Sequence, residues 1–424
     1  MFEKLVQIFK IKDLRRKILF VLGVFVVFRI MANIPVPGIN IENLREFFER
    51  FQMFGLLNVF VGGTLSRISI VMLGLGPYIT AIVIFQLLTL IFPALERMYK
   101  EEGEAGRRRF NQYARIATVP LAALQGYGML TLLQRQGAIS FASPQMLFSA
   151  IITVTAGTMF LMWLGELITE KGIGNGVSLL IFAGIVAEMP SNIRQALIAW
   201  TPAQLPSYIF FIFATFLIIF GVVMVTEARR NIPVSYAKRV RGIRMYGGVS
   251  TYLPMNVNPA GVIPIIFALS VLLFPSMIAN FLSGVGGTVG EIAQNIADFF
   301  ENQILWGVLY FILVFVFTYF YTMVTFDPKT ISQNLQKMGG FIPGIRPGPS
   351  TTRYLSFILH RVLFIGALFL GLIAVMPSIV QGLTRIIAFS FLIGGTSVLI
   401  IVAVVLDTLK QINAQLQMRE YEKI

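Results

Sequence analysis

The sequence predicts an all-α integral membrane protein with ten transmembrane helices. Its composition is the first reason: 56% of the 424 residues are hydrophobic and only 13% are charged, whereas soluble domains carry about 25% charged residues. The second reason is a series of nearly charge-free runs, each close to the roughly 20 residues that cross a bilayer as a helix. The third is the distribution of the basic residues, because 27 of the 34 Lys and Arg residues fall into alternate connecting segments.

The predicted spans are separated by connections of very different length. They cover residues 18–34, 74–93, 114–134, 147–168, 173–188, 205–226, 259–280, 303–325, 362–382 and 386–407. Arg29 lies near one end of the first span, from which a long side chain reaches the interface. The amphipathic, basic segment 1–17 precedes this span, and no small-residue cleavage site follows it. We therefore interpret 18–34 as a retained span and not as a signal peptide.

The positive-inside rule orients these spans. The basic residues gather on one side when residues 1–17 are cytoplasmic, and an even number of spans also puts the tail 408–424 inside. Part of the net charge of +14 is therefore an orientation signal. Two inner loops, 227–258 and 326–361, are more basic than orientation requires. This surplus predicts docking surfaces for an anionic partner, either a protein or RNA.

Glycine and proline interrupt the helical pattern in two places. A glycine pair and Arg67 break the stretch 55–77, which predicts a short half-helix over 58–67 followed by a full span. The seventh span is broken in a comparable way at 258–264. Each interruption falls at the second span of a five-span half, which indicates an inverted repeat. The alternative is that Gly and Pro are simply common in membrane helices.

This interpretation divides the chain into two halves. The N-terminal half covers 18–190 and the C-terminal half covers 205–407, and an external hinge loop at 191–204 joins them.

The chain lacks the residues that membrane enzymes and ion-coupled pumps need. It has no cysteine and a single histidine, His360, so we predict no thiolate nucleophile and no metal site. The acids nearest the spans, Glu166, Glu188 and Asp407, lie at span ends, which disfavours an ion-coupled secondary transporter, the alternative function. The glycines of 172–176 are not followed by Lys and Ser or Thr, so they form no P-loop. We predict no catalytic residue and no cofactor, and any driving energy must come from a partner.

Two long and irregular segments resemble the signature segments of the SecY family. They are residues 69–81, SIVMLGLGPYITA, and residues 163–178, WLGELITEKGIGNGVS. Shorter matches lie at 102–108, 236–239, 260–264, 339–348 and 394–397. The resemblance extends from about residue 12 to 420. Ile82 departs from it, because the family more often has a small polar residue there.

The resemblance implies a fold of two five-helix halves around a central hourglass pore. A ring of apolar side chains closes this pore at mid-membrane, and the motifs place the ring at Leu75, Ile79, Val177, Ile181, Ile266 and Ile400. The half-helix corresponds to a plug on the outer side, formed by Asn58, Val59, Phe60, Val61, Gly62, Gly63, Thr64, Leu65, Ser66 and Arg67. The second and seventh spans resemble the two sides of a lateral gate.

The same resemblance implies a central channel subunit of a protein translocase in the bacterial cell (inner) membrane, with both termini cytoplasmic. Such a channel passes unfolded secretory polypeptides and releases transmembrane segments into lipid. Its expected partners are SecE-like and SecG-like membrane subunits, the SecA motor ATPase, the ribosome, signal peptides, nascent chains and membrane lipid. Motor and ribosome docking is expected at Arg346, Lys238, Arg239, Arg241, Arg244, Lys337 and Arg353.

Overall fold

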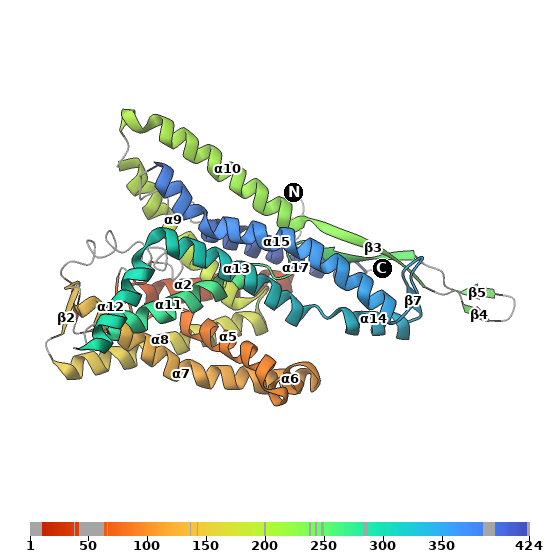
Figure 1. Ribbon diagram of the computed structural model, residues 1–424, viewed down its shortest axis with the longest axis horizontal. Helices are drawn as coiled ribbons and strands as arrows, with labels where there is room; N and C mark the ends of the chain where they lie inside the picture. Colours follow the sequence, from red (N-terminus) through yellow and green to blue (C-terminus); the bar gives the residue numbers. More distant parts are fainter. Residues whose placement is uncertain are drawn as a thin grey trace.

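Long helices dominate the computed structural model (Figure 1). The described residues are 11–37, 39–41, 63–65, 67–135, 137–141, 143–198, 201–236, 239–241, 244–246, 250–282, 287–384 and 395–421. Helices suit the apolar runs because a helix satisfies its backbone hydrogen bonds internally, and lipid offers no partner for them.

The N-terminal half contains six described helices. They are α2 (Lys12–Ala32), α5 (Gly76–Ile91), α6 (Pro93–Lys100), α7 (Gly103–Arg135), α8 (Pro144–Lys171) and α9 (Gly176–Ile198). The axes of α5 and α6 differ by 113°. Pro93 explains this bend, because a proline disfavours helical backbone at the residue before it, and Phe92 is extended with φ −107° and ψ 107°.

The C-terminal half adds seven described α-helices. They are α10 (Leu205–Glu227), α11 (Ile263–Leu282), α12 (Thr288–Glu301), α13 (Gln303–Thr325), α14 (Pro328–Lys337), α15 (Pro349–Thr384) and α17 (Gly395–Tyr421). The short 3₁₀ helix η1 (Pro202–Gln204) precedes α10.

Each of the ten predicted spans overlaps a described helix, although residues 386–394 of the tenth lie outside the described residues. Among the described residues, seven helices are long and apolar enough to cross a membrane, or eight if the bent pair α5–α6 counts as one span. The other two predicted spans correspond to α2, which carries several basic residues at its start, and α11, which contains Pro275. The predicted helical membrane architecture is therefore confirmed, although length and composition alone do not identify all ten helices as spans.

The fifth predicted span continues beyond its expected end. Helix α9 runs through Pro190 to Ile198, so residues 191–198 of the predicted hinge loop 191–204 are helical. A proline need not end a helix whose neighbours satisfy the freed carbonyl group.

The described parts of the two basic inner loops contain strands and a helix where the sequence predicted only loop. Strands β3 (Arg229–Tyr236) and β6 (Ser250–Asn256) pair in antiparallel register, and β7 (Gly340–Phe341) joins the other edge of β3. Strand β4 (Arg239–Arg241) pairs with β5 (Arg244–Tyr246). A further pair, β1 (Ile39–Ile41) and β2 (Ile139–Phe141), completes the described strands.

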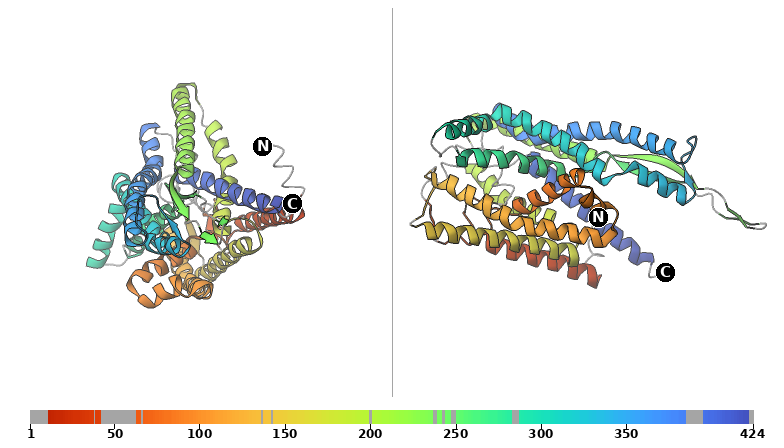
Figure 2. Two further views of the ribbon diagram at one scale, coloured as in Figure 1. Left: turned by 90° about the vertical axis from the view of Figure 1, so that its right-hand side faces the viewer. Right: turned by 60° about the horizontal axis from the view of Figure 1, so that its bottom comes forward.

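The basic elements lie together at one end of the molecule. In Figure 1, α14 and β3 to β7 lie toward the right, whereas α12 and β2 lie toward the left. Figure 2 shows in its end-on view that one end of α10 projects beyond the other helices, although α10 also contacts α17. Only 11% of the membrane window of α10 is buried, so most of this helix presents apolar side chains outward.

One large hydrophobic cluster joins the two halves, with members from α2, α5, α8 and α9 and from α10, α11, α13, α15 and α17. Glycines permit the closest helix contacts. A Cβ atom at Gly176 would lie 1.9 Å from the carbonyl oxygen of Gly165, and one at Gly157 would lie 2.0 Å from that of Ile70. Helices α8 and α9, and the segment before α5, can therefore approach as they do only because these residues lack side chains.

Candidate functional site

The six side chains predicted to form the ring all belong to the large hydrophobic cluster that joins the two halves. Leu75 precedes α5 and Ile79 lies in its first turn, Val177 and Ile181 lie one turn apart on α9, and Ile266 and Ile400 lie on α11 and α17. Five of the six are buried, and Val177 is partly buried against them. The fold thus joins aliphatic residues from four helical regions and from both halves of the chain.

A cavity of about 1050 Å³ lies directly against this cluster. Ile79, Val177, Ile181 and Ile266 belong to its lining. The remaining lining is mixed: it includes the polar side chains of Gln86, Arg108, Asn111, Gln112, Arg115, Glu166, Thr169, Glu170, Asn175 and Ser178, and the aromatic side chains of Tyr78, Trp163, Phe267 and Tyr321. Many come from the start of α7 and the end of α8, next to the predicted cytoplasmic segments.

An ion pair holds the polar wall of this cavity in place. Arg115 Nε on α7 lies 2.5 Å from Glu166 Oε1 on α8. Among the described residues, no group of three or more His, Asp or Glu side chains could hold a metal ion. Polar side chains, mainly from α7 and α8, and aliphatic side chains from α5, α9 and α11 therefore line the same cavity.

The chain directly before α5 packs against α7 and α8 in a second hydrophobic cluster. We call its described residues, Gly63–Leu65 and 67–75, the outer segment. They form turns, and Leu65, Ile68 and Met72 are fully buried. Residues 58–62 and Ser66 of the predicted plug lie outside the described residues, and the four remaining plug residues belong to this segment.

Backbone hydrogen bonds attach the outer segment to the end of α2. The amide of Val36 donates to the carbonyl of Ile68 at 2.9 Å, and the amide of Ile70 donates to the carbonyl of Ile34 at 3.0 Å. Charged side chains add a second attachment, since Arg67 lies 3.5 Å from Glu188 on α9. Sequence analysis did not predict this pair, because 121 positions separate its members.

Three of the seven predicted docking residues, Lys337, Arg346 and Arg353, lie on a small folded platform. Strands β3 and β6 pack with α14 and the start of α15 around Ile232, Val234, Met255, Leu335, Ile342, Leu355 and Leu359. Lys337 and Arg353 are exposed on its helices. Arg239, Arg241 and Arg244 belong to β4 and β5, of which only the backbone is described, and Lys238 lies outside the described residues.

Arg346 occupies an exposed turn between β7 and α15. Its carbonyl accepts a hydrogen bond from Thr351 Oγ1 at 3.0 Å, and Ser332 Oγ on α14 donates to the carbonyl of Gly348 at 2.9 Å. Gly344 and Gly348 have φ of 81° and 101°, a region that favours glycine. The turn therefore holds the Arg346 backbone in a defined position while its side chain faces solvent.

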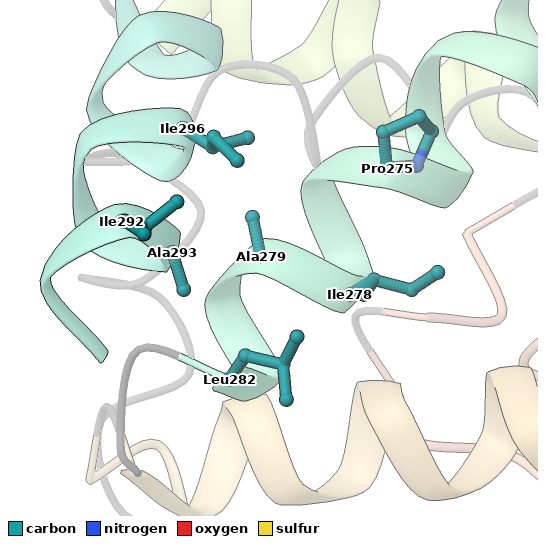
Figure 3. A pocket seen from close by; sticks show the side chains of 7 residues that line it. All are labelled: Pro275, Ile278, Ala279, Leu282, Ile292, Ala293 and Ile296. Carbon is teal, nitrogen blue, oxygen red and sulfur yellow. The ribbon is translucent and has the colours of Figure 1, made fainter. Parts of the chain in front are cut away.

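A second cavity, of about 370 Å³, lies between α11 and α12 (Figure 3). Its lining consists of Pro275, Ile278, Ala279, Leu282, Ile292, Ala293 and Ile296. All seven side chains are apolar, so this cavity can accept only apolar groups.

A sequence profile of the SecY family matches residues 69–409. The chain is 45% identical over 433 residues to protein translocase subunit SecY of Thermotoga maritima, covering 100% of this chain and 97% of that protein. The chain belongs to the SecY family. Among other family members, the Thermus thermophilus SecY is 44% identical, with 97% of this chain and 95% of that protein covered.

Solved structures with the SecY fold superpose on most of the chain. One is described as a protein conducting channel and matches with a TM-score of 0.65 at 21% identity, covering 93% of this chain and 91% of that one. Sec61 in the canine ribosome-channel complex from the endoplasmic reticulum matches with a TM-score of 0.62 at 22% identity, with the same coverage. At these identities, both structural similarities show that the fold is shared.

Proposed function

We propose that this chain is the central pore-forming subunit of a bacterial protein translocase, and that unfolded polypeptides pass through the ring of Leu75, Ile79, Val177, Ile181, Ile266 and Ile400. The observation that carries the proposal is that four of these six side chains, Ile79, Val177, Ile181 and Ile266, line a cavity together with many polar side chains. A polypeptide enters from the cavity, meets only aliphatic groups at the constriction, and leaves past the outer segment.

The ring suits this task because aliphatic side chains offer no specific bond to any sequence. When the constriction is empty, its apolar surface expels water and thereby blocks ions. When a polypeptide occupies it, the same side chains can change rotamers and close around the chain. An ion-coupled transporter, the alternative, requires coordinating or titratable groups at membrane depth, and the ring provides none.

A lateral exit is part of the proposal. Helices α5 and α11 contact each other beside the cavity, and Ile79 and Ile266 lie on these two helices. Separation of α5 from α11 would open a path from the ring to lipid for signal peptides and nascent transmembrane segments.

The driving force comes from partners that dock on the basic platform. SecA and the ribosome are the proposed partners, because an anionic protein surface or ribosomal RNA complements Arg346, Lys337 and Arg353. One relative of known structure is described in a ribosome-channel complex. SecE-like and SecG-like subunits would pack on the exposed helices. We assign the chain no enzymatic step, and we place it in the cell (inner) membrane with both termini cytoplasmic.

The test uses the absence of cysteine from the chain. An Ile181→Cys variant is paired with a secretory precursor that carries one cysteine and is arrested midway through transport. We expect a disulfide between the two that depends on SecA and ATP. Val186→Cys, on a 38% exposed side chain of the same helix, is the control and should not form it. Efficient transport without a crosslink at position 181 would show that the polypeptide takes another route.

A further inference from the structure

Glu188 is an acidic residue in an unusual place. It lies in α9, and its side chain is only 12% exposed. A carboxylate in such a position costs several kcal/mol unless it is paired. The channel function assigned above uses the apolar residues of α9 and gives this carboxylate no role.

Two arginines from different elements share this carboxylate. Glu188 Oε1 lies 3.5 Å from Arg29 Nη1 on α2 and 3.5 Å from Arg67 Nη2 in the outer segment. Ser191 Oγ, one turn further along α9, lies within hydrogen-bonding distance of Glu188 Oε2, at 3.2 Å. Three parts of the chain that are far apart in sequence therefore meet at one acidic group.

The outer segment is shaped to receive this group. A Cβ atom at Gly63 would lie 2.1 Å from Glu188 Cδ, and Gly63 has φ of 74°. Only glycine can both adopt this positive φ and leave room for the Glu188 side chain without strain. The carboxylate thus rests against the backbone of the outer segment as well as beside the Arg67 guanidinium.

Arg67 is also bound to the end of α2. It donates a hydrogen bond to Asn33 Oδ1, and Asn33 Nδ2 donates to the carbonyl of Arg29 at 2.7 Å. Removal of the negative charge would leave Arg29 and Arg67 close together with nothing between them to offset their repulsion. Loss of the Glu188 charge would therefore weaken the attachment of the outer segment in two ways: the attraction between Glu188 and Arg67 disappears, and Arg29 and Arg67 repel each other.

We propose that Glu188 is an electrostatic latch that holds the outer segment in its closed position. The arginine side chains are 34% and 38% exposed, so water can replace the carboxylate when the segment moves. The latch is thus firm enough to favour the closed channel and weak enough to release during transport. This inference rests on the proposed function, in which the outer segment closes the outer side of the channel.

The experiment measures release of the segment without requiring transport. Thr64 is fully buried in the outer segment, so a Thr64→Cys variant gives a single thiol that reacts with a membrane-impermeant maleimide only when the segment opens. We expect Glu188→Gln to raise the labelling rate about tenfold or more, because the ion pairs of the carboxylate with Arg67 and Arg29 are lost. Arg67→Gln should raise it as well, and the double variant should label no faster than the faster single variant.

Matched controls separate the latch from a general effect of charge removal. Glu291→Gln on the exposed side of α12 and Arg194→Gln on the exposed side of α9 should leave the labelling of the thiol at position 64 unchanged. If Glu188→Gln does not accumulate in the membrane, Arg67→Gln alone tests the same contact. An unchanged labelling rate in a folded Glu188→Gln or Arg67→Gln variant overturns the latch.

The crosslink at position 181 distinguishes failure of the latch from failure of the channel proposal. If labelling is unchanged and the crosslink forms normally, the channel proposal stands and only the latch proposal is refuted. Faster labelling without any crosslink supports the latch as a structural contact and refutes the proposed polypeptide route.

Discussion

Ile181 illustrates how much can depend on one aliphatic side chain. It is 5% exposed, belongs to the cluster shared by both halves and lines the cavity. We predict that Ile181→Gly raises the resting ion conductance of the channel in planar bilayers, because the constriction becomes wider and easier to wet.

The control for this substitution is Val186→Gly on the same helix. It carries a similar helix-propensity penalty of about 0.5 kcal/mol but changes a residue that is 38% exposed. Equal conductance in the two variants would mean that the cluster does not form the barrier to ions.

Arg346 provides the second prediction at the scale of the residue. Its side chain is exposed, whereas its turn is fixed by α14 and α15. Arg346→Glu should therefore leave folding and membrane insertion unchanged and weaken SecA binding by about 2 kcal/mol or more, roughly thirtyfold, as expected for an arginine hot spot.

Binding to inverted membrane vesicles and transport of a precursor would measure this effect. Lys329→Glu, an equal charge reversal near the start of α14, is the control and should have a smaller effect because Lys329 is not part of the turn that holds Arg346. If SecA binds the Arg346→Glu and Lys329→Glu variants equally well, Arg346 is not part of the docking surface.

The residues of the candidate site differ in how far the sequence could predict them. Nothing in the composition distinguishes Leu75 or Ile400 from other aliphatic residues of membrane helices, so only the long motifs selected them. Glu188 was visible as an acid at a span end, but its partners Arg29 and Arg67 were not, because a pair formed across the fold leaves no periodic signal in the sequence.

At the scale of the element, the platform formed by β3, β6, β7, α14 and α15 has its own small core. A substitution in this core can therefore be used to perturb the platform without changing the ring. Leu355 is fully buried in its small core, among Ile232 and Leu335. We predict that Leu355→Ala destabilises the platform by about 2–5 kcal/mol, the usual cost of a large-to-small change in a core.

Limited trypsin digestion of inverted vesicles would report this loss as faster cleavage after Arg229 or Arg230. Motor binding should fall, and the resting ion conductance should stay at its original value because the ring is untouched. Leu372→Ala, on a 45% exposed side chain of the same helix, is the control. Unchanged protease resistance in Leu355→Ala would show that the platform does not depend on this core.

Hydropathy predicted the long helices well because each requires about 20 apolar residues and few charges. The strands were missed for a physical reason. In β3 only Ile232 and Val234 are buried, and two arginines and an asparagine precede them, so the alternation is too short to stand out. The extension of α9 past Pro190 was missed because proline usually ends a helix.

At the scale of the whole molecule, charge and shape agree on one orientation. The basic platform lies at one end of the helices, and α12 lies at the other (Figure 1). If the platform is cytoplasmic, as the positive-inside rule requires, α12 must face the outside. Two exposed asparagines offer a matched test, Asn334 on α14 and Asn295 on α12.

We predict that a single Asn295→Cys variant reacts with an impermeant maleimide in intact cells from which the outer membrane has been removed, whereas Asn334→Cys reacts only in inverted vesicles. The two positions lie in different short helices of the same half, so the comparison depends only on the side of the membrane. Labelling of both from the same side would mean that an odd number of spans cannot separate α12 from α14. Because α13 is the only described helix between them, that result would remove α13 from the set of membrane spans and, with it, the two-sided channel.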